Sequence, residues 1–159
     1  MTRLSHVDEN GRASMVDVTR KDRTDRRAVA AGSVKVRPDV LEMIVSGGMS
    51  KGDVFQVARV AGIMAAKKTP DLIPLCHPVA VTKIGVEFEA DPGQGLIRIT
   101  AEACAADRTG VEMEAITAAT VAGLTIYDMC KAVQKDIEIG PFYLVEKEGG
   151  RSGRYSREK

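Results

Sequence analysis

The sequence predicts an α+β fold, in which a ferredoxin-like antiparallel sheet is covered by helices on one face. Residues 80–89 and 96–104 alternate apolar and polar side chains around a Pro-Gly turn at 91–95, as in a hairpin with one buried face. Two longer segments, 53–67 and 109–135, have helical character. Strands and helices are thus segregated rather than strictly alternating, which favours helices packed on one side of the sheet.

The N-terminal part predicts short strands and a charged loop. Residues 1–12 are polar and are expected to be flexible, while 14–18 and 28–36 are β-leaning. Between them, 19–27 (TRKDRTDRR) is dense in charge and includes Arg26. One interpretation is a solvated loop. The other is that its arginines face a polyphosphate, because a guanidinium can hold phosphate bidentately.

Two helices are expected next. The first covers 38–46, because a proline is tolerated in a first turn and a Gly-Gly pair follows. Asp53 is a good N-cap for the second, over 53–67. Residues 69–78 (TPDLIPLCHP) hold three prolines and are predicted to be neither helix nor central strand. Since this segment is also apolar, we expect it to pack down and hold its polar side chains in fixed positions.

The C-terminal part predicts the longest helix and a last strand. The helix is expected over 109–135, where Thr109 and Glu112 have the spacing of a capping box. Residues 137–145 are predicted as the last strand, and 147–159 as a flexible tail.

Composition limits the class of protein. The 159 residues fit a single domain, 1–159, with a formal net charge of +1. The balanced charge and the absence of Trp argue against an RNA-binding sheet or any other nucleic-acid partner. No apolar run approaches the ~20 residues that span a bilayer, and the N-terminus lacks a secretory signal. Three cysteines without CxxC spacing favour free thiols in a reducing, cytoplasmic setting.

His77 is the first candidate for chemistry, because it stands beside Cys76 in the stiff apolar segment. The alternative is a histidine that only hydrogen-bonds the loop. Adjacent residues of an extended segment point to opposite sides, so Cys76 and His77 are not expected to form a nucleophile pair. No second Cys/His pair has zinc-binding spacing, and no metal site is expected.

Asp128, Lys131 and Lys51 are the next candidates. Asp128 and Lys131 share one helical face, and the alternative is a surface ion pair worth ~0–1 kcal/mol. A partly buried lysine can have a depressed pKa and act as acid or base. Lys51 precedes a helix start, where a lysine and backbone donors can hold a phosphate. The stretch GGMSKGD lacks P-loop spacing, and an exposed turn lysine is the alternative there.

Glu112 and Glu114 begin the same long helix that carries Asp128. Glu112 has an alternative role as the capping-box partner, whereas Glu114 has none. In one straight helix, Glu112 and Asp128 would lie ~24 Å apart. Either Gly123 marks a break in the helix, or the site is built between subunits. We expect the second, an oligomer with its active site at a subunit interface.

Three stretches resemble one known family. KGDVFQVARVAGIMAAKKTPDLIPLCHPV (51–79) and GVEMEAITAATVAGLTIYDMCKAVQK (110–135) look like the two signature blocks of the MoaC family, the cyclic pyranopterin monophosphate synthases of molybdenum cofactor biosynthesis. SHVDENGRASMVDVTRK (5–21) resembles the opening of that family. Two departures stand out, since Val79 replaces an expected leucine and Arg27 falls where an acidic residue is common.

The resemblance implies a fold, an assembly and an activity. Members of the family are ferredoxin-like and form hexamers, as trimers of dimers with active sites at a dimer interface. They are phosphorus–oxygen lyases that convert a cyclised guanosine triphosphate, made by a radical SAM enzyme, to cyclic pyranopterin monophosphate and pyrophosphate. The resemblance implies no resident cofactor. A magnesium ion bound with the triphosphate is compatible with it, although we find no carboxylate cluster dedicated to one.

The resemblance also assigns residues. Its substrate contacts fall on Leu75, Cys76, His77, Met113 and Glu114. Its acid/base residue falls on Asp128, and its essential lysines on Lys51 and Lys131. Opening and reclosing a purine ring needs proton transfers, and a leaving pyrophosphate needs positive charge. We therefore expect catalytic roles for Asp128, Lys131, Lys51 and His77, and further substrate contacts from Glu112, Lys67 and Arg26.

A second class of function competes with this one. The chain could be a non-catalytic nucleotide-binding or assembly module, as many ferredoxin-like domains are. It would then use Lys51 and the basic segment 19–27 only to hold a phosphate.

Overall fold

The computed structural model describes residues 6–8 and 10–158, so part of the N-terminal segment expected to be flexible, 1–5 and 9, lies outside the described residues. The described residues form five strands and four helices. In chain order these are β1 (Thr24–Lys35), α1 (Pro38–Val45), α2 (Val54–Ala66), α3 (Thr69–Leu72), β2 (Val81–Asp91), β3 (Leu96–Asp107), α4 (Glu112–Cys130), β4 (Glu138–Glu148) and β5 (Tyr155–Ser156).

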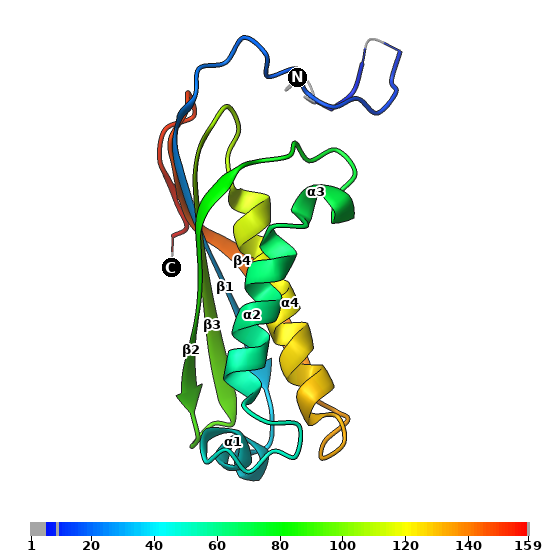
Figure 1. The fold of residues 1–159 in the computed structure, drawn as a ribbon, viewed down its shortest axis with the longest axis vertical. Coiled ribbons are helices and arrows are strands. Elements are labelled where there is room, and N and C mark those ends of the chain that lie inside the picture. Colours follow the sequence, from blue (N-terminus) through cyan, green and yellow to red (C-terminus); the bar gives the residue numbers. More distant parts are fainter. Residues whose placement is uncertain (1–5, 9, 159) are drawn as a thin grey trace.

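The strands form one antiparallel sheet in the order β2-β3-β1-β4-β5. The first four strands in this order, with α2 and α4 as the connecting helices, make the ferredoxin-like arrangement. Both long helices lie on one face of the sheet, and α1 lies at one end of it (Figure 1). The predicted fold class is confirmed. Every described helix is too short or too polar to cross a membrane.

Small side chains allow the helices to approach the sheet and each other closely. The buried face of α4 consists largely of alanines, including Ala115, Ala118 and Ala122, which are fully buried. They pack over the inner faces of β1 and β3, where Ile97 and Ile99 are also fully buried. Burying this apolar surface is the main favourable contribution to the fold.

The strand predictions are right for the hairpin and wrong for the N-terminal boundary. The charged segment 19–27 is not wholly a loop, because β1 begins at Thr24. Residues 14–18, expected to be β-leaning, lie outside the strands. Arg27 can occupy a strand because its guanidinium lies 2.8 Å from Glu102 on β3 and 2.5 Å from Glu146 on β4. These partners are far away in the sequence, so local pattern does not reveal them.

Three further boundaries differ from the prediction. The segment 69–78 contains one helical turn, α3, because Pro70 is tolerated in a first turn. Helix α4 is shorter at both ends than 109–135. The expected flexible tail, 147–159, instead continues β4 to Glu148 and returns as β5, which pairs with β4.

The helices α2 and α4 run antiparallel (Figure 1). The C-terminal end of α2 therefore lies beside the N-terminal end of α4, at the end of the molecule where the connection from α3 to β2 also lies. The N-terminal end of α2 lies beside the C-terminal end of α4, at the opposite end. This arrangement decides where the candidate site residues can meet.

Gly62 is expected to be essential for the contact between α2 and α4. A Cβ atom at this position would lie 2.8 Å from the backbone oxygen of Ala118 and 3.1 Å from Val86. We predict that Gly62→Val lowers the free energy of unfolding by about 1–3 kcal/mol in urea denaturation, because overpacking forces the helices apart. As a control, Gly85→Ala is expected to change stability little, because no described heavy atom beyond its own residue and its two chain neighbours lies within 4 Å of the added Cβ. Equal effects of the two substitutions would contradict the prediction.

Candidate active site

Asp128 lies between two lysines at one end of the helix layer. Its carboxylate accepts a hydrogen bond from Lys131 Nζ at 2.7 Å, and Lys51 Nζ lies 3.4 Å from its other oxygen. Lys51 also donates to the backbone oxygen of Asp128, at 2.9 Å. The turn before α2 and the C-terminal end of α4 thus bring together the three residues that the sequence marks as candidates.

The charges of this cluster stabilise one another. The hydrogen bond from Lys131, together with the charges of Lys131 and Lys51, lowers the pKa of Asp128. The same hydrogen bond and charge raise the pKa of Lys131. The expectation of a partly buried lysine with a depressed pKa is therefore wrong for Lys131, whose side chain is 51% exposed. In this arrangement Asp128 is an anion and Lys131 is an ammonium, and each stabilises the charged form of the other.

A second group of candidates lies at the opposite end of the helix layer. A cavity of about 350 Å³ lies between the loop after α3 and the start of α4. The candidates Leu75, Cys76, His77, Glu112 and Met113 line it, together with His6, Ile73, Thr109 and Gly110. His77 donates from Nε2 to the backbone oxygen of Val16, at 2.6 Å. This bond fixes the ring and leaves Nδ1 as its other polar atom.

Glu114 is a buried carboxyl group close to this cavity. Its residue surface is 1% exposed, and neither carboxyl oxygen has a hydrogen-bond partner among the described residues. Burial raises the pKa of Glu114 to about 7. Burial, followed by the charges of Glu114 and Glu112, raises the pKa of Cys76, which is therefore a neutral thiol near pH 7. Glu114 can thus gain or lose a proton near neutral pH, whereas Cys76 is no thiolate nucleophile.

Glu112 has a role other than the predicted capping box. Val111, rather than Thr109, occupies the N-cap of α4. The carboxylate of Glu112 accepts a hydrogen bond from Lys147 Nζ at 2.7 Å. It lies over Gly110, where a Cβ atom would come within 1.9 Å of it. Glu112 is therefore held by a residue of the last long strand, which the sequence alone does not associate with it.

A larger, basic cavity adjoins the first one. Its volume is about 500 Å³, and it shares Thr109, Gly110 and Glu112 with the cavity at His77. Five basic residues line it, namely Lys21, Arg26, Arg108, Lys147 and Arg151, against the two acidic residues Asp22 and Glu112. Arg26 is fixed by hydrogen bonds to the backbone oxygens of Asp107 (3.1 Å) and Arg108 (3.3 Å). Such a cavity suits a polyanion.

Some of these residues were missed by sequence reasoning. Lys147, Arg108 and Arg151 come from segments that were assigned no function, and 147–159 was expected to be flexible. The sequence feature that comes nearest to indicating this part of the cavity is the Gly-Gly pair at 149–150, because it allows a tight turn next to a basic residue. Lys67 lies at the C-cap of α2 and is exposed, at the same end of the molecule as His77.

One chain does not bring the two groups of candidates together. Helix α4 is continuous from Glu112 to Cys130, so Glu112 and Asp128 lie ~24 Å apart along it. Gly123 does not break the helix. It makes room for Phe142, whose ring would lie 2.6 Å from a Cβ at this position. Of the two alternatives raised by the sequence, a break at Gly123 is therefore excluded.

The fold and these two ends define a class of protein: a ferredoxin-like α+β domain with an Asp–Lys cluster at one end and a cavity lined by basic side chains at the other. A family model described as the MoaC family matches residues 15–150. The chain belongs to the MoaC family. In the described part of the chain, no group of three or more His, Cys, Asp or Glu side chains is placed to hold a metal ion.

Curated relatives are similar over nearly the whole chain. A protein of Pelotomaculum thermopropionicum is 56% identical over 157 residues, covering 99% of this chain and 92% of the relative. A Roseiflexus protein is 54% identical over 155 residues, covering 98% of both chains. A protein of Pelobacter propionicus is 57% identical over 156 residues, again covering 98% of both. Each is named cyclic pyranopterin monophosphate synthase.

The buried carboxyl of Glu114 makes stability depend on pH. Burial raises its pKa from 4.5 to about 7, so between these values the folded chain binds more protons than the unfolded chain. The free energy of unfolding therefore falls as pH rises through this range. We predict that Glu114→Gln is more stable than the wild type at pH 8, by up to roughly 3 kcal/mol, and that the difference is small at pH 4.

The measurement is urea denaturation of both proteins at the two pH values. Glu42→Gln, a change at an exposed glutamate of α1, serves as the control and is expected to show no such dependence on pH. A difference between Glu114→Gln and the wild type that is the same at pH 4 and pH 8 would argue against a raised pKa of Glu114.

Proposed function

We propose that this chain is a cyclic pyranopterin monophosphate synthase that acts on a cyclised guanosine triphosphate. The observation that carries the proposal is the pair of adjoining cavities at one end of the helix layer, one basic and one lined by His77. A nucleoside triphosphate has two matching parts: a polyanion that suits the basic cavity, and a ring system with nitrogen and carbonyl groups that suits the cavity at His77. The name of the relatives supports the same product.

The basic cavity would bind the triphosphate. Forming the cyclic phosphate requires a sugar hydroxyl to attack the α-phosphorus while the bond to the β-phosphate breaks. The hydroxyl proton passes to a base, and pyrophosphate leaves with its negative charge. Arg26 and Lys147 are positioned by hydrogen bonds to face that charge, and fixed positive groups stabilise a leaving anion more than mobile ones do. A magnesium ion bound with the triphosphate could share this role.

Rearrangement of the ring needs groups that give and take protons. Glu114, with a pKa of about 7, can do both near neutral pH. His77 is oriented by its bond to Val16 and would hold the guanine-derived part. At the other end of the chain, Lys131 is a proton donor and Asp128 an acceptor, with Lys51 adding positive charge.

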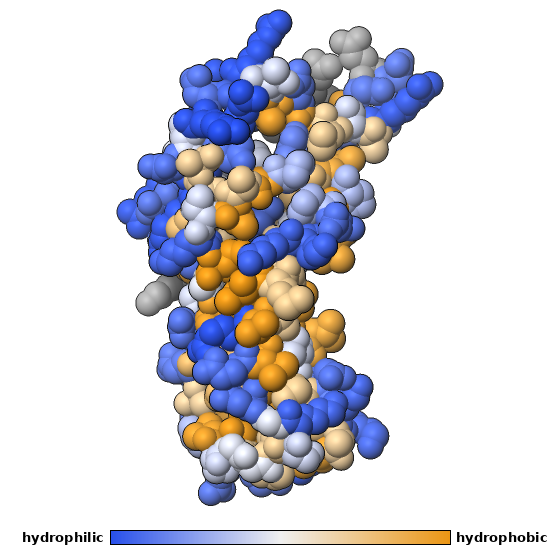
Figure 2. Space-filling view, in the orientation of Figure 1, coloured by the Kyte–Doolittle hydropathy of each residue, from blue (hydrophilic) through white to orange (hydrophobic). Residues whose placement is uncertain are grey.

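The two ends would meet between two copies of the chain. The unbroken helix α4 keeps them ~24 Å apart within one copy. A band of exposed apolar side chains runs along α2 and α4 (Figure 2), including Val57, Val60, Met64 and Leu124, each 42–61% exposed. Such a band supports contact with a further chain. We propose a hexamer, as a trimer of dimers with interface active sites, in the cytoplasm, where the three thiols stay free.

The first test is turnover of the cyclised guanosine triphosphate by the purified protein. Pyrophosphate release and the oxidised pterin product are followed together. We expect both products from the wild type, and a loss of about 100-fold or more in kcat for Asp128→Ala and Lys51→Ala. Asp39→Ala is the matched control, because Asp39 is also an exposed aspartate in an ion pair, with Arg37 at 3.0 Å. Binding of the substrate without either product would instead support the non-catalytic module.

The second test addresses the shared site. His77→Ala and Lys131→Ala proteins, each expected to be inactive, are mixed under conditions that exchange subunits. If each site takes His77 from one chain and Lys131 from the other, half of the sites in a mixed dimer are intact. Random mixing should then restore about a quarter of wild-type turnover. No recovery, after subunit exchange has been verified by mass, would contradict an active site shared between chains.

A further inference from the structure

The hairpin of β4 and β5 forms one wall of the basic cavity. Gly150, Arg151 and Ser152, in the connection between the two strands, line the cavity. Lys147 spans the cavity wall, since its Nζ lies 2.7 Å from the carboxylate of Glu112 and 3.3 Å from Ser152 Oγ. The position of this connection therefore sets the width of the cavity and the position of one of its positive charges, Arg151.

Backbone pairing holds the two strands of this hairpin unequally, because β4 pairs with β1 as far as Glu148, opposite Arg27, whereas β5 is held by few pairs. Among the described residues, two pairs join β5 to β4, Glu146 with Ser156 and Lys147 with Tyr155, and one more backbone hydrogen bond runs from Arg157 to Val145, at 2.8 Å. A two-residue ladder is marginal in water. Side-chain contacts must therefore supply the rest of the free energy that keeps β5 and its connection attached to β4.

Arg154 supplies two of these side-chain contacts. Its guanidinium lies 3.3 Å from the carboxylate of Glu146 and 3.6 Å from that of Glu148. The guanidinium of Arg157 lies over the ring of Tyr143, 4.6 Å from its centroid, and adds a cation–π contact. Arg154 is 67% exposed, so its ion pairs would contribute little if they stood alone.

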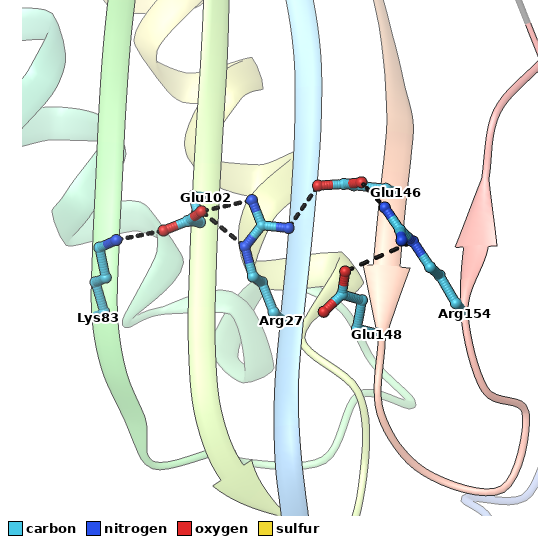
Figure 3. A network of polar contacts seen from close by, with 6 residues as sticks. All are labelled: Arg27, Lys83, Glu102, Glu146, Glu148 and Arg154. Atoms are coloured by element: carbon cyan, nitrogen blue, oxygen red, sulfur yellow. Dashed lines mark hydrogen bonds and ion pairs between the residues drawn. The ribbon is translucent and has the colours of Figure 1, made fainter.

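The ion pairs of Arg154 do not stand alone, because their partner Glu146 is itself held in place by other side chains. A ladder of alternating charges crosses the sheet on the face opposite the helices, from Lys83 through Glu102, Arg27 and Glu146 to Arg154 (Figure 3). The carboxylates of Glu102 and Glu146 are only 23% and 22% exposed. The hydrogen bond from Arg27, and then that from Arg154, lowers the pKa of Glu146. Arg27 thus fixes the carboxylate to which Arg154 binds.

The hairpin connection lies directly against β1. A Cβ atom at Gly149 would lie 2.0 Å from the backbone oxygen of Asp25, and one at Gly150 would lie 1.8 Å from the guanidinium of Arg26. Both glycines have positive φ angles, of 102° and 72°, which side chains disfavour. The connection therefore covers Arg26, an arginine of the cavity, and any outward movement of the hairpin would uncover it.

We infer that Arg27 and Arg154 are positioning residues for the substrate's polyphosphate. Acting through Glu146, they hold β5 and the connection before it against β4, and so set the width of the basic cavity. Neither residue is among the described residues that line the cavity, so they act through the hairpin and not by contact with the ligand. The inference rests on the proposed function for the identity of the ligand.

The test compares Arg27→Ala and Arg154→Ala with the wild type. We expect KM for the cyclised guanosine triphosphate, and Kd for pyrophosphate measured by calorimetry, to rise about tenfold, with kcat within about twofold. Hydrogen exchange at the amides of 149–153 should accelerate in both variants. Arg27→Lys, which keeps the charge, should restore part of the affinity.

Arg98→Ala is the matched control. Arg98 lies on the same face of the sheet and pairs with Glu89 (3.3 Å) and Asp91 (3.9 Å), away from the hairpin. Unchanged KM and pyrophosphate affinity in Arg27→Ala and Arg154→Ala would overturn the inference. Equal losses in Arg98→Ala would overturn it as well, because they would indicate general destabilisation. If the wild type turns over no substrate, the proposed function fails, while pyrophosphate binding still decides the inference.

Discussion

The close packing of α4 against the sheet and against α2 determines where every candidate residue lies. Alanines on the buried face of the helix, and Gly123 opposite Phe142, let the helix axis approach the strands without a kink. A helix that stays straight over 19 residues cannot bring its own ends together. The core packing therefore separates the Asp128 cluster from the His77 cavity, and this separation is the physical argument for the proposed site shared between chains.

The same helix holds two carboxyl groups in opposite electrostatic environments. Glu114 is buried without a hydrogen-bond partner among the described residues, and its pKa is raised to about 7. Asp128 is exposed between two lysines, and its pKa is lowered. Two carboxyls with separated pKa values are the usual basis for dividing acid and base roles in one enzyme. The fold separates the two pKa values with one residue in the first turn of the helix and one in the last.

Much of this structure could be predicted from local pattern, and the remainder depends on distant partners. The hairpin of β2 and β3, the N-cap at Asp53 and the helical spacing of α2 are local features, and each was predicted. Arg27 was assigned to a loop because its strand position depends on Glu102 and Glu146, which no local window contains. The Asp128 cluster could be anticipated from i, i+3 spacing and from family resemblance. The basic cavity could not, since its side chains come from several distant segments.

The two edges of the sheet resist pairing with strands of other chains. Along β2, Lys83, Glu87 and Glu89 are exposed charges. On the other side, β4 contains Pro141, which has no N–H to donate, and β5 covers part of its edge with only two residues. Edge charges, prolines and very short edge strands all oppose the continuous strand addition that leads to aggregation. Any contact with another chain is therefore expected through side-chain surfaces and not by extension of the sheet.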